Sequence, residues 1–280
     1  MGTTTMARKL FQSVQESFAR KSVYQRLREY TRFVDVRYET DDFLVSTAKS
    51  GREVTKILEL RHDVFVKEWQ GRSFFHGLDM DEYDLTADHL MITDKRIGEV
   101  VGTYRLISSK LTQNFYSASE FDIGRFLTRP GIKLELGRAC VRPEYRDGIS
   151  IDLLWKGLAR YIFATGTDTV FGCASIKSTD AALISGLVRQ LIEQGQWNDD
   201  YAIRPNAHYR FEDFSLTRHA TATVEERKRL LPPLLRSYLH AGAMTHGWPA
   251  LDEEFRCIDL FTVLDWNGLS DKFRTRFVKL

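Results

Sequence analysis

A glutamate and an arginine stand three residues apart in one β-prone run of the chain. Residues 132–141 carry Glu135 and Arg138 on either side of Gly137, and the run leads directly into the start of a helix. Side chains alternate faces along a regular strand, so residues three apart share a face only where an extra residue bulges the strand. Gly137 is where we expect such a bulge. A carboxylate, a fixed guanidinium and freed backbone N–H donors would then suit acyl transfer to an amine.

Glu135 is the candidate general base of such a reaction. Amide formation from a thioester needs a group that takes a proton from the attacking amine, and donors that stabilise the developing oxyanion. The alternative is structural, because a buried carboxylate is normally paired and Arg105 or Arg138 could be its partner. The two roles are compatible, since a paired carboxylate can still orient an ammonium group or pass a proton through water.

Several short motifs resemble, in order and spacing, those of two related acyltransferase families. The chain carries Arg61-His62-Asp63-Val64-Phe65, Trp69, Asp81-Glu82-Tyr83-Asp84, Gly102-Thr103-Tyr104-Arg105-Leu106 and Glu135-Leu136-Gly137-Arg138. These motifs resemble those of the acyl-homoserine-lactone synthases and the ornithine-lipid N-acyltransferases, which share the GNAT (acyl-CoA N-acyltransferase) fold. Residues 115–122, 153–157 and 171–175 are similar to the ornithine branch, sometimes labelled hemolysin-like.

The resemblance implies an acceptor site built from charged and aromatic residues. It implies catalytic roles for Glu135 and Arg138, clustered with the acceptor-binding residues. The implied acceptor-binding residues come from earlier segments and are Arg61, Phe65, Trp69, Asp81, Asp84 and Arg105. A guanidinium can bind a substrate carboxylate through two hydrogen bonds, and paired carboxylates suit an ammonium group. The alternative for residues 81–84 is a solvated loop.

Residues 142–150 occupy the place where GNAT acetyltransferases carry a glycine-rich loop that holds the coenzyme A pyrophosphate. Only Gly148 is present here, and no Gly-x-Gly or Gly-x-Ala pair follows Arg142 and Arg146. A helix start capped by Ser150 could still bind the single phosphodiester of phosphopantetheine. We therefore expect an acyl-phosphopantetheine on acyl carrier protein as the donor, and no tightly bound cofactor. Arginines that flank an exposed turn are also common without such a role.

The remaining candidate groups are aromatic residues, histidines and cysteines. Phe115, Phe121 and Phe126 either line a pocket for a long acyl chain or belong to the core. We expect no metal site, because the histidines show neither an HExxH motif nor a close ligand pair. The three cysteines show no CxxC spacing, so we expect free thiols in a reducing compartment.

Charge and hydropathy limit the class of protein. The chain has 40 Lys+Arg against 38 Asp+Glu, a near balance that argues against a general nucleic-acid-binding protein. The sequence begins without an apolar signal region and has no apolar window long enough to span a bilayer. We expect a cytoplasmic protein, with peripheral attachment to the inner face of the cytoplasmic membrane left open.

The hydrophobic pattern predicts a mixed α/β fold. We expect strands at 42–48, 88–93, 99–107, 132–141, 169–174 and 257–264, with helices at 52–68, 150–165, 180–194 and 233–242. Residues 8–34 predict an amphipathic helix with a basic polar face, typical of membrane-surface helices but also of helices that dock on their own domain. We divide the chain into this N-terminal helix, 1–36, and a GNAT-like domain, 37–280, with a C-terminal extension from about residue 200.

The resemblance and the donor argument together lead to a specific expectation. We expect a bacterial lipid-biosynthesis enzyme that moves a 3-hydroxy fatty acyl group from acyl carrier protein to the α-amine of ornithine, giving a lyso-ornithine lipid. The enzyme alternatives are an acyl-homoserine-lactone synthase or another N-acyl amino acid synthase. The non-enzyme alternative is a membrane-active or acyl-binding protein of the hemolysin-like kind.

Overall fold

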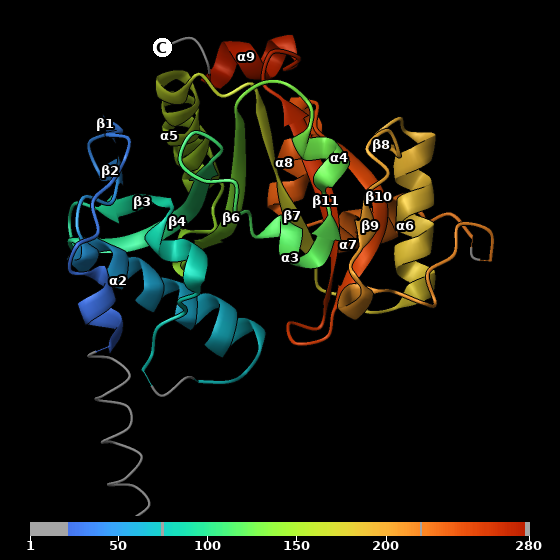
Figure 1. The fold of residues 1–280 in the computed structure, drawn as a ribbon, viewed down its shortest axis with the longest axis horizontal. Coiled ribbons are helices and arrows are strands. Elements are labelled where there is room, and N and C mark those ends of the chain that lie inside the picture. The colour runs from blue at the N-terminus through green and yellow to red at the C-terminus, as the bar shows by residue number, and fades with distance from the viewer. Residues whose placement is uncertain (1–21, 74–75, 219, 278–280) are drawn as a thin grey trace, which may run out of the picture. The chain divides into compact units, whose positions relative to one another are not determined.

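The computed structural model describes residues 22–73, 76–218 and 220–277, and Figure 1 shows the chain as a ribbon. The chain divides into two compact units: unit 1 comprises residues 1–106 and 138–164, and unit 2 comprises residues 107–137 and 165–280. Strand β6 (Lys133–Val141) belongs to unit 2 up to Gly137 and to unit 1 from Arg138. Each unit combines strands with helices, which confirms the predicted mixed α/β class.

Unit 1 is an antiparallel sheet with a helix on each face. Its strands pair in the order β1 (Arg37–Glu39), β2 (Phe43–Thr47), β3 (Asp88–Asp94) and β4 (Glu99–Ser108). Its helical segments are α2 (Gly51–Arg61), the π-helix η1 (His62–Trp69), the 3-10 helices η2 (Glu82–Leu85) and η3 (Pro143–Tyr145), and α5 (Ile149–Thr165).

Alternation along β3 explains why both faces are covered. Met91 packs in one hydrophobic cluster with Ile57 and Leu58 of α2. The preceding residue, Leu90, packs against Gly157 of α5. A Cβ atom at position 157 would lie within 2.9 Å of the Leu90 side chain. Successive strand residues point to opposite faces, so α2 and α5 cover opposite faces of this sheet. Glycine at position 157 allows the close approach of α5.

Unit 2 is a second set of strands with its own helices. The start of β6 pairs in parallel with β7 (Thr169–Ile176), and β7, β11 (Cys257–Asp265) and β10 (Met244–Asp252) follow as antiparallel neighbours. The short β8 (Trp197–Asn198) runs parallel to β10, while β5 (Phe121–Asp122) pairs with β9 (Arg204–Pro205). The helical segments are α3 (Ser117–Glu120), α4 (Gly124–Leu127), α6 (Ala181–Glu193), η4 (Ala207–Tyr209), α7 (Val224–Leu230), α8 (Pro233–Ala241) and α9 (Asp271–Phe277).

The two faces of the unit 2 strands differ in character. Ile258 and Leu260 of β11 pack with α6 and α8 in a hydrophobic cluster. Phe261, on the opposite face, contacts Phe121 and Phe126 from the segment that carries α3 and α4. This second face also carries polar side chains of β7 and β11.

The strands and helices predicted between 42 and 194, the helix from 233 and the strand from 257 are confirmed within a few residues. The predicted helix 52–68 is a continuous helical run whose second half is π-helical. Strand β10 and the shorter elements β1, α7 and α9 were not predicted. All three cysteines are free thiols, as expected. Among the described residues, no helix combines the length and apolar character that crossing a bilayer demands.

The predicted N-terminal helix is only partly covered by the structure. Its residues 8–21 lie outside the described residues. Residues 22–27 are helical, but the helix ends there and not at 34. Leu27 and Tyr30 are buried in the cluster that contains α2, and the Tyr30 hydroxyl donates to the Ala87 carbonyl at 3.2 Å. This part of the segment therefore packs on unit 1.

Candidate functional site

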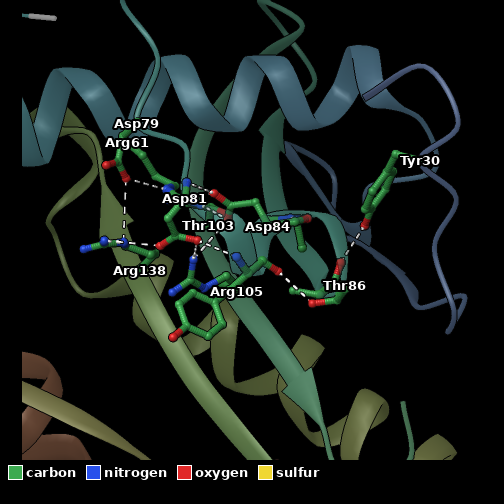
Figure 2. Close-up of polar contacts among 12 residues, drawn as sticks. Tyr30, Arg61, Asp79, Asp81, Asp84, Thr86, Thr103, Arg105 and Arg138 are labelled. Carbon is green, nitrogen blue, oxygen red and sulfur yellow. Dashed lines mark hydrogen bonds and ion pairs between the residues drawn. The ribbon is translucent and has the colours of Figure 1, made fainter. Parts of the chain in front are cut away.

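Three arginines and three aspartates meet in unit 1, and Figure 2 shows their side chains pointing toward one another. We call this group the ion cluster; its members are Arg61, Asp79, Asp81, Asp84, Arg105 and Arg138. Arg61 ends helix α2, Arg105 lies in β4 and Arg138 lies in β6, while the aspartates come from the loop before and within η2. Of the charged residues that the resemblance implied for the site, all but Glu135 belong to the ion cluster.

Arg61 and Asp84 form the buried centre of the ion cluster. Arg61 contacts both oxygens of Asp84, at 2.5 and 3.2 Å, and its Nε donates to Asp79 Oδ2 at 2.8 Å. Arg105 Nη1 bridges Asp81 and Asp84 at 2.5 and 3.2 Å. The side chains of Arg61, Arg105 and Asp84 are at most 1% exposed. These three residues are packed as an interior ion network.

Asp81 and Arg138 form the accessible edge of the ion cluster. Their side chains are 24% and 16% exposed, and Arg138 Nη2 lies 3.4 Å from Asp81 Oδ2. Asp81 also caps η2: its side chain accepts from the Tyr83 N–H while Asp84 accepts from the Asp81 N–H. This reciprocal cap fixes the loop, so the alternative of a merely solvated loop at 81–84 is wrong.

The electrostatics of the ion cluster favour charged aspartates. Burial would raise the pKa of Asp84, but Arg61 and Arg105 outweigh it and hold that pKa well below the ordinary range. The pKa of Asp79 is lowered in the same way, with Arg61 and Arg138 opposing its burial. His89, whose Nε2 lies 2.9 Å from the Asp84 carbonyl, is buried, and burial lowers its pKa to about 4. The imidazole of His89 is therefore neutral near pH 7.

Glu135 lies in unit 2 and holds the start of helix α3. Its carboxylate accepts from the Tyr116 N–H at 2.7 Å, from the Ser117 N–H at 2.6 Å and from the Ser117 hydroxyl. The residue is 2% exposed and faces Phe171 in the last parallel pair between β6 and β7. Hydrogen bonds to the ionised form stabilise a carboxylate, so these donors anchor the turn at 116–117. The role of Glu135 as a base stays a prediction.

The expected irregularity of β6 is present but sits one residue later than predicted. Arg138, not Gly137, has the left-handed backbone, with φ 49°. This conformation costs roughly 1–2 kcal/mol for a residue other than glycine. The ion pairs of Arg138 with Asp79 and Asp81 offset that cost and turn the side chain into the ion cluster. Prediction from sequence placed the irregularity at the glycine because glycine is the residue that most often adopts this backbone.

The two aromatic residues implied for the acceptor site lie on the π-helix η1. Phe65 is half-buried, and the Arg138 guanidinium lies 6.0 Å from its ring centroid. Trp69 ends η1 and is also half-buried. A π-helical turn shifts the side chains that follow it around the helix axis. The Phe65 ring thus lies next to the ion cluster, beside Arg138.

The predicted donor residues surround the start of helix α5. Gly148, with φ 94°, makes the turn, and α5 begins at Ile149, whose N–H donates to Asp147 Oδ1 at 3.0 Å. The expectation that Ser150 caps the helix is wrong, because Ser150 lies inside the first turn and its hydroxyl donates to the Tyr145 carbonyl. Asp147 has the better position for a cap.

The two arginines before this helix already have partners within unit 1. Arg146 forms a bidentate salt bridge with Glu68, in which Nη1 and Nη2 donate to the two carboxylate oxygens at 2.6 and 2.7 Å. Arg142 donates to the Val100 carbonyl at 3.1 Å and lies 3.6 Å from Glu99. The Arg146 and Arg142 side chains stay partly exposed, at 42% and 37%. Contact with an acidic carrier protein would compete with these surface pairs.

Phe115, Phe121 and Phe126 are at most 1% exposed and belong to one aromatic group in unit 2. Phe115 and Phe126 contact Phe171, with ring centroids 5.2 and 4.9 Å apart. The structure thus gives these residues a core-packing role. Their predicted role in lining an acyl pocket stays a prediction.

Sequence reasoning missed two groups of residues. Asp79 belongs to the ion cluster, and its closeness to Asp81 in the sequence was the available signal. In unit 2, Asp252, Cys257 and Asp259 are buried and place their ligand atoms within 4.8 Å of one another. Their spacing in the sequence matches no recognised metal-ligand motif, so no site was expected there.

Comparison with known proteins places these features in a family. The acetyltransferase (GNAT) domain matches residues 60–156. The L-ornithine N(alpha)-acyltransferase of Rhizobium meliloti is 34% identical over 81% of this chain and 81% of its own, and that of Brucella abortus is 32% identical over 82% and 86%.

The comparison with solved structures finds acyl-homoserine lactone synthases. A CoA-dependent synthase of this kind covers 82% of this chain and 89% of its own, with 12% identity and a TM-score of 0.45. A second, bound to SAM and isopentyl-CoA, covers 80% and 82%, with 17% identity and a TM-score of 0.43. These structural matches have low sequence identity. The family assignment therefore rests on the sequence identity with the two ornithine acyltransferases, which extends over most of each chain. The chain belongs to the L-ornithine N(alpha)-acyltransferases, within the GNAT fold.

Proposed function

We propose that this N-acyltransferase moves a 3-hydroxy fatty acyl group from acyl carrier protein to the α-amine of ornithine, forming a lyso-ornithine lipid. The choice of ornithine as acceptor rests on one observation, the sequence identity of 34% with a relative named L-ornithine N(alpha)-acyltransferase. That relative matches over four fifths of its length, so both units of this chain are included in the comparison.

The proposed chemistry is an aminolysis of a thioester. The neutral α-amine attacks the thioester carbonyl, an N–C bond forms, and the C–S bond breaks to leave the thiol of the carrier-bound phosphopantetheine. The nitrogen loses one proton, which reaches Glu135 directly or through a water molecule and then the leaving sulfur. The position of Glu135 at the last pair between β6 and β7 and its fixed orientation on Tyr116 and Ser117 support this role.

The proposed donor is an acyl carrier protein and not coenzyme A. The loop at 142–150 supports this choice, because it offers one glycine turn and one helix start and lacks the glycine-rich run that holds a pyrophosphate. The partly exposed Arg142 and Arg146 flank that turn and could meet an acidic carrier surface. We extend the proposal to peripheral attachment at the inner membrane face, where an amphiphilic product would be delivered.

A reconstituted reaction tests the proposed function. Purified protein is incubated with 3-hydroxyacyl carrier protein and isotope-labelled ornithine, and the organic phase is analysed by mass spectrometry. We expect labelled ornithine acylated on its α-nitrogen, with one carrier thiol released per product. A reaction that instead acylates S-adenosylmethionine and yields an N-acyl-homoserine lactone with methylthioadenosine as leaving group would favour the synthase alternative. Failure to acylate any amine would contradict the proposal as a whole.

A further inference from the structure

The turn before helix α5 lies beside the turn between strands β3 and β4 in unit 1. The Tyr145 hydroxyl, at the end of η3, donates to Oδ2 of Asp94, the last residue of β3, at 2.9 Å. Arg142 makes a second link, because its Nε donates to the Val100 carbonyl of β4 at 3.1 Å. These two hydrogen bonds hold the two turns side by side.

Each of these turns exposes an isoleucine. Ile97, in the turn between β3 and β4, is 57% exposed, and Ile149, the first residue of α5, is 54% exposed. Tight turns between strands are usually built from glycine, asparagine, aspartate or serine, so an isoleucine at position 97 is unexpected. A single exposed apolar side chain is common, but two on neighbouring turns favour contact with another molecule.

Three guanidinium groups accompany the isoleucines. The side chain of Arg96 is 66% exposed, and those of Arg142 and Arg146 are 37% and 42% exposed. Arg96 is held in place by the buried Asp94, to which its Nε and Nη2 donate at 3.2 and 2.8 Å. Exposed guanidinium groups suit the carboxylates of an acidic partner. We call this group the turn surface; its members are Arg96, Ile97, Arg142, Arg146 and Ile149.

Neither turn is covered at its glycine. Gly98 and Gly148 have left-handed backbones, with φ 70° and 94°. A Cβ atom at either position would meet no heavy atom of the described residues within 4 Å. The backbone of both turns therefore leaves room for a second molecule to approach.

We propose that the turn surface is the docking site of the acyl carrier protein, with Ile97 and Ile149 as its apolar contacts. This inference rests on the proposed function. Phosphopantetheine is attached to its carrier through the phosphodiester that the start of α5 is proposed to bind. The carrier must therefore lie against the exposed residues around that helix start, which are those of the turn surface. The three arginines pair with carboxylates of the acidic carrier, and the two isoleucines add buried apolar area.

The test compares Ile97→Ser, Ile149→Ser and the double variant with the wild-type protein, at saturating ornithine and varied 3-hydroxyacyl carrier protein. We expect each single change to raise KM for the carrier by about 5–10-fold, because it removes an apolar contact. The double variant should raise KM by about 25–100-fold, since separate contacts add. The value of kcat should stay within about 2-fold of wild type, because neither side chain touches the reacting groups.

The response to salt distinguishes the isoleucines from the arginines. Burial of apolar area is not screened by ions, so the increase in KM for the isoleucine variants should persist as salt rises. The increase in KM for Arg142→Gln should instead weaken. The inhibition constant of the unacylated carrier, which binds without reacting, should rise by the same factor as KM in each isoleucine variant.

Ile97→Leu and Ile192→Ser are the control variants. Ile97→Leu keeps an apolar side chain of the same volume and should retain the KM of the wild-type protein within about 2-fold. Ile192 lies in α6, outside the turn surface, and is 37% exposed, so Ile192→Ser should change neither KM nor kcat. The melting temperature of each variant checks its fold. If the double variant melts lower than wild type, Ile97→Ser alone decides the test.

The possible failures can be told apart. An unchanged KM in a folded Ile97→Ser variant, with a wild-type protein that acylates ornithine from the carrier, contradicts the docking site and leaves the proposed function intact. An equal rise in KM for Ile192→Ser also contradicts the docking site, because the effect would then not depend on the turn surface. A wild-type protein that does not accept the acyl carrier protein contradicts both the docking site and the proposed donor.

Discussion

Glu135 combines a structural contact with a proposed chemical role. The carboxylate holds the turn at 116–117 through three donors, so a change at this position would disturb the turn as well as the proposed proton transfer. The side chain is buried at the end of the β6–β7 pairing. Separating the two roles requires a variant that disturbs the turn without removing the negative charge.

Replacing Glu135 with Gln removes the negative charge and keeps the size of the side chain. We expect kcat to fall by about 10²–10⁴-fold, since a general base contributes this much. Ser117→Ala, which removes one donor and keeps the carboxylate, should lower the melting temperature but retain activity within about 10-fold. The exposed Glu225→Gln serves as control. If Glu135→Gln keeps activity within a few-fold of wild type at saturating substrate, Glu135 is not the base.

Asp84 is the residue on which the ion cluster depends. Changing Asp84 to Asn leaves Arg61 buried with a weaker partner, so we expect a loss of about 3–5 kcal/mol in the free energy of unfolding, measured by urea denaturation. The exposed Asp63, which pairs with Lys67, gives a matched control, and Asp63→Asn should change stability by less than about 1 kcal/mol.

The difference in stability between Asp84→Asn and wild type should also depend on pH. The pKa of Asp84 is lowered in the folded protein, so its stabilising contribution is present above the ordinary Asp range and is lost as the pH falls through the lowered value. The difference in stability between Asp84→Asn and wild type should therefore shrink below about pH 4. A constant difference from pH 7 to pH 3 would contradict the assignment of a charged Asp84.

At the scale of elements, the N-terminal segment divides into two parts with separate expected roles. Leu27 and Tyr30 pack on unit 1, and the Phe33 and Val34 N–H groups donate to Asp88 at 2.8 and 3.0 Å. The docking alternative thus fits residues 27–34. Residues 1–21 lie outside the described residues, and their sequence has four basic side chains against one acidic side chain: Arg8, Lys9, Arg20 and Lys21 against Glu16. The membrane alternative concerns this first part.

Two truncations separate the roles of this segment. Deleting residues 1–21 should abolish co-sedimentation with anionic vesicles, because each Lys or Arg near such a surface contributes roughly 1 kcal/mol to binding. The melting temperature and the activity on dispersed substrates should stay near those of the full chain. Deleting residues 1–34 should also lower the melting temperature, because it removes Leu27, Tyr30 and the donors to Asp88. Full-length protein that does not co-sediment with anionic vesicles would contradict the membrane role.

The next prediction concerns the acyl donor and the turn before α5. We expect kcat/KM for an acyl carrier protein thioester to exceed that for the matching acyl-coenzyme A. Arg142→Gln and Arg146→Gln should raise KM for the carrier alone, and the effect should weaken as salt rises. Arg52→Gln, at an exposed position of α2, is the control. Equal use of the two donors by the wild-type protein would contradict the carrier preference.

Elements could be predicted from the sequence better than contacts could. The apolar periodicity that identifies α2, α5 and α6 is local, so it is visible in the chain itself. The ion cluster was expected only through the resemblance. Asp79 was missed because its one local signal, its closeness to Asp81, does not by itself distinguish it from a surface aspartate. The buried group of Asp252, Cys257 and Asp259 could not be predicted either, because only the pairing of β10 with β11 brings these side chains together.

At the scale of the whole molecule, the central claim is that this chain makes an acylated ornithine. The most direct test is the lipid extract of bacterial cells that lack ornithine lipids and express the full chain. We predict a new ninhydrin-reactive, phosphate-free lipid whose mass is that of ornithine acylated on its α-nitrogen, absent from cells that express Glu135→Gln. An unchanged lipid extract from cells that contain the folded wild-type protein would contradict the account.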